Sequence, residues 1–156
     1  MNIKILAMDV DGTLTDGKVY IADKGEFMKA FDIKDGYGIS ILKDHGIIPV
    51  IITGRTSKIV AERAKELKVE EVHQNVADKL DTLKEIAKKY NLSSENVAYI
   101  GDDLNDIDCL NWCGFSACPN DAVDEVKRIV DYQCSKNGGS GAVREFIGFI
   151  MKKANM

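Results

Sequence analysis

Short, continuous apolar runs alternate with amphipathic segments along nearly the whole chain. The first run is continuous rather than alternating, which is typical of a strand buried on both faces of a parallel sheet. The segments between the runs carry apolar residues at helical spacing, most clearly in residues 78–90, where Asp78 is placed to cap the helix. This alternation predicts an α/β fold, a Rossmann-like doubly wound parallel sheet covered by helices on both faces. The expected strands are residues 3–10, 47–52, 97–100, 115–117 and 130–133, with a short one near Val72. The expected helices are residues 36–45, closed by Gly46, and 57–67, 78–90, 106–112, 122–129 and 142–153.

Residues 18–31 interrupt this alternation. There, KVYIA and EFMKAF flank Asp23-Lys24-Gly25, a pattern that predicts a β-hairpin with glycine in its turn. The 156 residues, 45% of them hydrophobic, are enough for one substantial core. We therefore expect a single domain over 1–156 that includes the hairpin and a C-terminal tail and helix, 136–156.

Charge and composition limit the classes of partner. The net charge of −4 argues against nucleic acid and anionic membranes, which are bound by clustered Lys and Arg, and favours a small soluble ligand. The N-terminus does not resemble a signal peptide, and no run of 18 apolar residues occurs, so we expect a cytoplasmic protein. The four cysteines lack paired C-x-x-C spacing, which indicates packed, reduced thiols rather than a zinc or redox site.

Polar side chains follow the predicted strands at the points where these strands end. Asp9 and Asp11 follow the first strand, Thr53 follows the second, and Lys79 opens the helix after the third. Asp102, Asp103 and Asp106 follow the strand at 97–100. Because parallel strands end at one edge of the sheet, where ligands bind in such folds, these residues are expected to converge on one site.

The residue types at this edge suit phosphoryl transfer. Asp9 and Asp102 could share Mg²⁺, a hard cation that prefers carboxylate, water and phosphate oxygens, while Lys79 and Thr53 could hold the remaining phosphate oxygens. Asp9 could attack phosphorus as a nucleophile. Asp11 could protonate the leaving alkoxide and then deprotonate the hydrolytic water. Asp103 and Asp106 are expected to orient water or the surroundings of the metal.

Four ordered motifs carry a resemblance to a known family. DVDGT at 9–13, TGR at 53–55, DK at 78–79 and GDDLND at 101–106 resemble the motifs of the haloacid dehalogenase superfamily. LTDGKVYI, KAFDIKDGYGI, VADKL, VAYIGDDLND and GGSGAVRE resemble its 3-deoxy-D-manno-octulosonate 8-phosphate phosphatase subfamily, over nearly the whole chain.

This resemblance implies a Mg²⁺-dependent phosphatase without a separate cap domain that acts on a phosphorylated sugar acid. It implies a metal site of Asp9, Asp11 and Asp102, and phosphate or substrate contacts from Thr53, Gly54, Arg55, Lys79 and Arg144. It also implies a homotetramer in which hairpins 18–31 assemble and neighbouring subunits cover the active sites. The glycine-rich tail with Arg144 would then reach a substrate or a neighbouring site.

Other functions fit parts of the pattern. A nonulosonate 9-phosphate is the alternative substrate, and Arg55 fits the eight-carbon acid better. A phospho-acceptor signalling domain also uses Mg²⁺, an acidic cluster, Thr and Lys, but in that class the acidic pair precedes a lone acceptor Asp on a later strand. A non-catalytic oligomerisation module is a third reading, which the intact set of acidic residues, Thr53 and Lys79 argues against.

Overall fold

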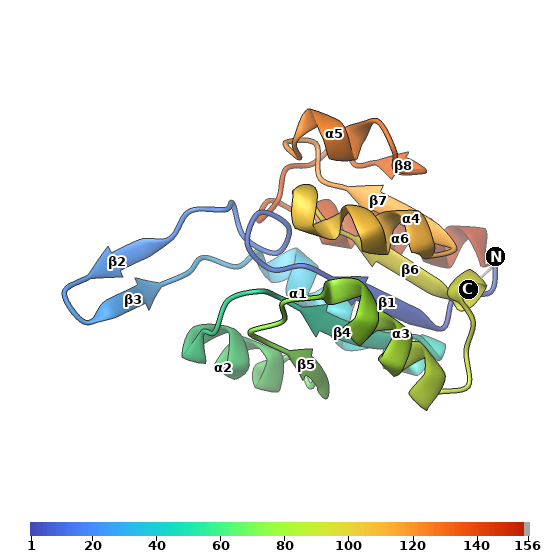
Figure 1. The fold of residues 1–156 in the computed structure, drawn as a ribbon, viewed down its shortest axis with the longest axis horizontal. Coiled ribbons are helices and arrows are strands. Elements are labelled where there is room, and N and C mark those ends of the chain that lie inside the picture. The colour runs from blue at the N-terminus through green and yellow to red at the C-terminus, as the bar shows by residue number, and fades with distance from the viewer. Residues whose placement is uncertain (155–156) are drawn as a thin grey trace.

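A six-stranded, fully parallel sheet forms the centre of the protein (Figure 1). The computed structural model describes residues 1–154. The strand order is β5-β4-β1-β6-β7-β8. The strands are β1 (Ile5–Met8), β4 (Ile48–Ile52), β5 (Glu71–His73), β6 (Val97–Ile100), β7 (Phe115–Cys118) and β8 (Tyr132–Gln133). The predicted doubly wound parallel sheet is confirmed.

Helices cover both faces of this sheet, and β1 is buried between them. Leu6 and Met8 pack in one apolar cluster with α1, α2 and α6. Ile5 and Ala7 point to the opposite face and pack with α3, α4 and α5. The alternation of side chains along the strand therefore builds two cores from one apolar run. The helices are α1 (Ile33–Ile41), α2 (Lys58–Glu66), α3 (Lys79–Lys89), α4 (Ile107–Trp112), α5 (Asp124–Lys127) and α6 (Ala142–Lys153).

The order of the strands fixes where a ligand can bind. From β1 the chain passes through α1 to β4 and then β5 on one side, and it later returns to β6 on the other side of β1. The connections after β1 and after β6 leave toward opposite faces, since α1 and α4 belong to different cores. The carboxyl ends of β1 and β6 therefore flank the topological switch point, where ligands bind in open α/β sheets.

The predicted hairpin is present and forms a separate two-stranded sheet. β2 (Tyr20–Ala22) pairs antiparallel with β3 (Gly25–Met28), with a register shift at Tyr20/Ile21. It projects from the body of the domain at the end away from the N-terminus (Figure 1). Ile21 and Phe27 are 71% and 60% exposed, so the hairpin presents apolar side chains outward.

The helix predicted for residues 36–45 begins earlier and ends earlier. The Asp32 carboxylate accepts hydrogen bonds from the N–H groups of Lys34 and Asp35, so α1 starts at Ile33. After Ile41 the chain tightens into a 3₁₀ turn at residues 43–45. Gly46 then closes this segment with a left-handed φ of 70°, as expected for a glycine at that position.

Three later elements are shorter than predicted. The segment 122–129 is helical only over α5, because Val123 is extended and its N–H donates to the Asp102 carbonyl at 3.0 Å. The strand expected at 130–133 is reduced to β8, because Asp131 instead accepts from the Ser116 backbone N–H (2.8 Å). The helix expected at 106–112 is preceded by a 3₁₀ turn at 104–106 and begins at Ile107. The C-terminal tail predicted from residue 136 leads into α6, as expected. Residues 155–156 of the predicted segment lie outside the described residues.

The cysteines are free thiols. Cys109, Cys118 and Cys134 are buried, and Cys113 is half-buried. This agrees with the packed, reduced thiols expected from their spacing. Among residues 1–154, no helix combines the length and the apolar character that crossing a membrane requires.

Candidate active site

Asp9 lies directly after β1, and a tight turn follows it. Its backbone N–H donates to the carbonyl of Ile100 on β6 at 3.1 Å. The N–H groups of residues 13, 14 and 15 then all donate to the carbonyl of Val10, at 3.1, 2.9 and 3.1 Å. Gly12 has a φ of 93°, and a Cβ at this position would lie 2.0 Å from Oδ2 of Asp102. Only glycine therefore lets the Asp102 carboxylate come so close to the turn.

Three carboxylates meet at this point. Oxygen atoms of Asp9, Asp102 and Asp106 all lie within 4.8 Å of one another. Asp9 is 6% exposed, Asp106 is fully buried, and Asp102 is held by a 2.8 Å hydrogen bond from the Thr13 hydroxyl. Buried carboxylates at this spacing repel one another unless a cation or protons lie among them. Carboxylate oxygens are also the ligands that Mg²⁺ prefers, so this cluster fits such an ion.

Asp106 is occupied by hydrogen bonds within the protein. Its Oδ1 accepts from Nζ of Lys79 (2.8 Å) and the hydroxyl of Tyr99 (2.7 Å). Its Oδ2 accepts from the backbone N–H groups of Asp102 and Asp103, at 3.0 and 3.2 Å. With four donors on two oxygens, Asp106 has little capacity left for a metal and instead fixes the loop that carries Asp102. The oxygens open to a cation belong to Asp9 and Asp102.

Burial and mutual repulsion alter the protonation of this cluster. Desolvation, with the neighbouring carboxylates, raises the pKa values of Asp9 and Asp102 as a coupled pair. Desolvation also lowers the pKa of Lys79, but the Asp9 and Asp106 carboxylates more than offset it and the net shift is upward. Lys79 therefore stays an ammonium, and the acidic pair takes up a proton at a higher pH than ordinary carboxyl groups do.

Lys79 enters the site from the first turn of α3. The Asp78 side chain caps that helix as predicted, accepting from the Asp81 N–H at 2.9 Å. Nζ of Lys79 lies 2.7 Å from Oδ1 of Asp9, and its side chain is 3% exposed. The helix N-terminus is an unfavourable place for a cation, and the two carboxylates supply the compensating negative charge.

Arg55 brings the end of the TGR segment close to Asp11. Thr53 is 3% exposed at the end of β4, and its N–H donates to the His73 carbonyl on β5. Gly54 leads to Arg55, whose half-exposed side chain brings Nε to 3.9 Å from Oδ2 of Asp11. The Asp11 carboxylate itself lies outside the oxygen cluster of Asp9, Asp102 and Asp106.

Two hairpin residues near Asp11 were not identified from the sequence. Nζ of Lys29 donates to Oδ1 of Asp11 and lies 2.8 Å from Oε1 of Glu26. The sequence holds no signal for these contacts, since charged residues are common in exposed hairpins. Tyr99 was also missed, because it reads as one more apolar residue of β6.

The tail glycines pack against the turn that follows Asp9. The Gly139 N–H donates to the Thr13 carbonyl at 3.1 Å. A Cβ on Gly138 would lie 1.9 Å from the Gly12 carbonyl oxygen, so the two backbones are in direct contact. The segment 138–139 therefore packs directly on the turn that follows Asp9 and is not merely a hinge before α6.

The side chains of Arg144 and Asp103 make their hydrogen bonds outside the oxygen cluster. The Arg144 backbone N–H donates to Oδ1 of Asp35 (2.8 Å), and its guanidinium donates to the Lys34 carbonyl (3.1 Å). Within this chain Arg144 thus attaches α6 to α1. Asp103 is exposed, and its Oδ1 accepts from the N–H of Leu104 at 2.7 Å.

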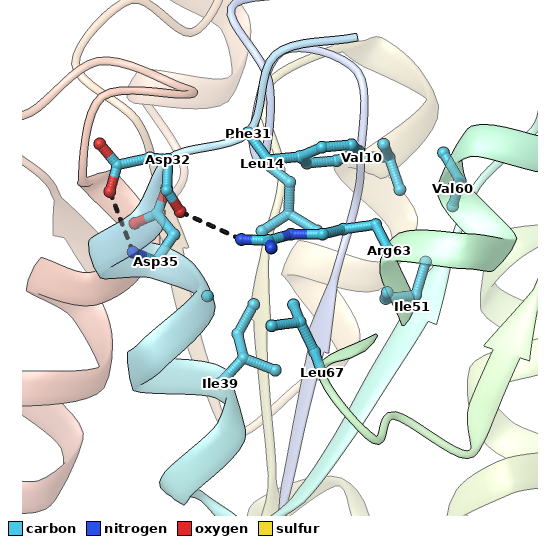
Figure 2. A pocket seen from close by; sticks show the side chains of 11 residues that line it. Val10, Leu14, Phe31, Asp32, Asp35, Ile39, Ile51, Val60, Arg63 and Leu67 are labelled. Atoms are coloured by element: carbon cyan, nitrogen blue, oxygen red, sulfur yellow. Dashed lines mark hydrogen bonds between the residues drawn. The ribbon is translucent and has the colours of Figure 1, made fainter. Parts of the chain in front are cut away.

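A hollow lies between α1 and α2 (Figure 2). Apolar side chains such as Leu14, Phe31 and Ile39 line it, and the Arg63 guanidinium extends across it toward the start of α1. Arg63 packs 5.5 Å from the centre of the Phe31 ring and donates to the Asp32 carbonyl at 3.5 Å. None of the clustered carboxylates lines this hollow, so it is not the candidate active site.

Comparison with known proteins agrees with this geometry. A family model described as haloacid dehalogenase-like hydrolase matches residues 68–147. The 3-deoxy-D-manno-octulosonate 8-phosphate phosphatase of Escherichia coli K12 is 39% identical over 150 residues, which are 96% of this chain and 80% of that protein.

Solved structures are equally similar. The Moraxella catarrhalis 3-deoxy-D-manno-octulosonate 8-phosphate phosphatase, in complex with magnesium, phosphate and KDO, is 42% identical with a TM-score of 0.93, over 97% of this chain and 87% of that one. The Yersinia pestis enzyme is 38% identical with a TM-score of 0.96, over 99% and 83% of the two chains. The chain belongs to the haloacid dehalogenase-like hydrolases, in the group of the 3-deoxy-D-manno-octulosonate 8-phosphate phosphatases.

Proposed function

We propose that this enzyme is a Mg²⁺-dependent phosphatase that hydrolyses 3-deoxy-D-manno-octulosonate 8-phosphate. The convergence of Asp9, Asp102 and Lys79 at the switch point carries the assignment of the reaction. The assignment of the substrate rests on the high similarity to phosphatases named for this compound, one of them in complex with KDO, phosphate and magnesium.

The proposed reaction has two steps. An oxygen of Asp9 attacks phosphorus, the P–O bond to the sugar breaks, and protonated Asp11 gives its proton to the departing alkoxide. Asp11, now a carboxylate, takes a proton from water, whose oxygen attacks the phosphorus of the aspartyl-phosphate and releases phosphate and free Asp9. Lys79 stabilises the charge on Asp9 and on the phosphoryl oxygens throughout.

We assign the metal to Asp9 and Asp102. Mg²⁺ held there would neutralise the repulsion between the carboxylates and the phosphate dianion. The Asp11 carboxylate lies outside the oxygen cluster and pairs with Lys29, so we assign its side chain to proton transfer rather than to the metal. Asp106 and Asp103 are assigned to support the loop of Asp102, and Thr53, Gly54 and Arg55 to contact the phosphate or substrate.

We further propose that the protein is one domain that assembles as a homotetramer through its hairpins. The exposed Ile21, Phe27 and Met28 on β2 and β3 support this, because a monomer rarely projects a strand pair with so much apolar surface. In such an assembly Arg144 and the tail would lie near a neighbouring site. The four free thiols are consistent with a reducing, cytoplasmic location.

Light scattering after gel filtration tests the assembly. The wild type should elute at four times the chain mass. The double variant Ile21→Ser/Phe27→Ser should instead elute at a lower mass, because its hairpins no longer hold the tetramer together. The exposed Asp44→Asn, far from the hairpin, should leave the mass unchanged. A monomeric wild type at micromolar concentration contradicts the tetramer.

Phosphate release from a substrate panel tests the activity. The panel holds 3-deoxy-D-manno-octulosonate 8-phosphate, nonulosonate 9-phosphates and hexose phosphates, with Mg²⁺ or with EDTA, and Asp9→Asn is compared with Asp44→Asn. We expect the fastest phosphate release from the eight-carbon acid. This release should be lost with EDTA and in Asp9→Asn, but not in Asp44→Asn. Preference for a nine-carbon acid would keep the mechanism and change the substrate, and no metal-dependent release would leave a binding or oligomerisation role.

A further inference from the structure

The Lys29 ammonium is buried between two carboxylates from different parts of the fold. Its side chain is 0% exposed, although it follows the exposed strand β3. Nζ donates to Oδ1 of Asp11, in the turn after β1, and lies 2.8 Å from Oε1 of Glu26. A buried ammonium is stable only when it is paired, so these contacts fix the position of Lys29.

Glu26, the second partner of Lys29, is in turn bound to the N-terminus of α2. Oε2 of Glu26 accepts from the Ser57 hydroxyl at 2.6 Å. Ser57 is itself the N-cap of α2, accepting from the Val60 N–H at 3.3 Å. Glu26 thus connects Lys29 to the N-terminus of α2 through Ser57. The ammonium is therefore fixed in position and is not a mobile surface charge.

The two oxygens of Asp11 have different surroundings. Oδ1 is bound by Lys29, whereas Oδ2 has only the Arg55 Nε at 3.9 Å, beyond hydrogen-bond distance. A carboxyl group can accept a hydrogen bond on one oxygen while the other carries the proton. Anchoring of Oδ1 therefore selects one orientation of the group and leaves Oδ2 for proton transfer.

We infer that Lys29 is a positioning residue, which holds Asp11 in the orientation from which Oδ2 gives a proton to the leaving group. The inference rests on the proposed function, in which Asp11 is the general acid. It also means that the hairpin supplies part of the catalytic geometry of its own subunit, in addition to any contact with neighbouring subunits.

The dependence on leaving group tests this role. A sugar alkoxide needs a proton to depart, whereas p-nitrophenolate and acetate do not. In Lys29→Met, kcat/KM for the sugar-acid phosphate should fall about 100-fold, the lower range for general acid catalysis. For p-nitrophenyl phosphate and acetyl phosphate it should fall less than about 3-fold, because kcat/KM reports only steps up to the first phosphoryl transfer.

Two further variants complete the experiment. Lys84→Met, on the exposed side of α3 and outside the hairpin, should match the wild type with every substrate. If Lys29→Met fails to fold, the double variant Lys29→Met/Glu26→Gln removes the unpaired charge of Glu26 and should show the same selectivity. Equal losses for alkyl, aryl and acyl phosphates would indicate a purely structural role, and no loss would exclude any role; either result overturns the inference.

These outcomes are separate from the proposed function. If the wild type prefers another alkyl phosphate, that compound replaces the sugar-acid phosphate and the comparison is unchanged. If the wild type releases no phosphate from any compound, the proposed function fails, and the inference that depends on it fails with it.

Discussion

Nζ of Lys79 lies 2.7 Å from Oδ1 of Asp9, so the residue assigned as nucleophile is paired with a buried cation from the start of α3. The same ammonium contacts Asp106, which in turn holds the backbone of the loop carrying Asp102. One cation therefore connects the ends of β1 and β6 with the first turn of α3. Through Lys79, the position of Asp9 and the position of the loop that carries Asp102 depend on each other.

Replacing Lys79 with Met should impair both activity and folding. We expect kcat/KM to fall by about 10²–10³-fold, since a charge-stabilising donor is lost. The free energy of unfolding should fall by about 3–5 kcal/mol, because the buried carboxylates lose their partner. Phosphate release and urea unfolding measure the two effects. Lys84→Met, on the exposed side of the same helix, should change neither, and normal turnover by Lys79→Met would contradict the assignment.

Mg²⁺ binding should expel a proton from the Asp9 and Asp102 pair. In the metal-free protein desolvation and repulsion raise the pKa values of this pair, whereas the ion requires both carboxylates ionised. The apparent affinity for Mg²⁺ should therefore increase as the pH rises through neutrality. Calorimetric titration at pH 7 in two buffers of different ionisation enthalpy should detect roughly one proton released per ion. An affinity independent of pH between 6 and 8 would exclude the shared proton.

Gly138→Ala should displace the tail from the turn after Asp9. The added Cβ would lie 1.9 Å from the Gly12 carbonyl oxygen, and backbone cannot yield as a flexible side chain does. We expect a loss of about 1–3 kcal/mol in unfolding free energy and a clear drop in kcat/KM. The matched control is Gly148→Ala, where a Cβ meets nothing within 4 Å. That helical position should gain about 0.5–1 kcal/mol without loss of activity, and equal behaviour of the two variants would refute the contact.

Asp35→Asn should stabilise the protein at neutral pH but not at acidic pH. Desolvation of this carboxyl, 2% exposed, raises its pKa to about 6, with Asp32 adding to the shift and the Arg144 N–H opposing it. Because the folded pKa exceeds the ordinary value of 3.8, the ionisation is destabilising. This effect is absent below pH 3.8, grows between 3.8 and 6, and is complete above 6.

The measurement is urea unfolding of both proteins at pH 4 and pH 8. The stability difference in favour of Asp35→Asn should be about 2 kcal/mol larger at pH 8, and the Asn oxygen can still accept from Arg144. A difference that does not change with pH would mean that Asp35 ionises normally.

Local signals explain what could be predicted from the sequence. The unbroken apolar run around Ile5–Met8 indicated a strand buried on both sides, and Asp78 indicated where α3 begins. Since strand ends share one edge of a parallel sheet, the convergence of Asp9, Lys79 and Asp102 could be predicted from the order of strands and helices alone.

Contacts between segments that are distant in the sequence could not be predicted from such local signals. Asp32 looks like any acidic loop residue, so the early start of α1 was missed. Lys29 meets Asp11 only because the hairpin base folds back on the turn after β1. Arg144 is bound to α1 through residues 34 and 35, 110 and 109 positions away, which no local pattern indicates.

The contact of Gly138 and Gly139 with the turn at residues 12–16 joins segments that a ribosome produces far apart in time. The strand that carries the nucleophile emerges early, together with the hairpin, and can begin to collapse with α1 and β4. Its turn remains uncovered until the glycines of the tail have also left the exit tunnel. The catalytic centre is therefore completed late in translation. A ribosome-bound chain that lacks residues 138–139 should already hold the carboxylates of the site, but the turn after Asp9 should lack the backbone contacts that cover it.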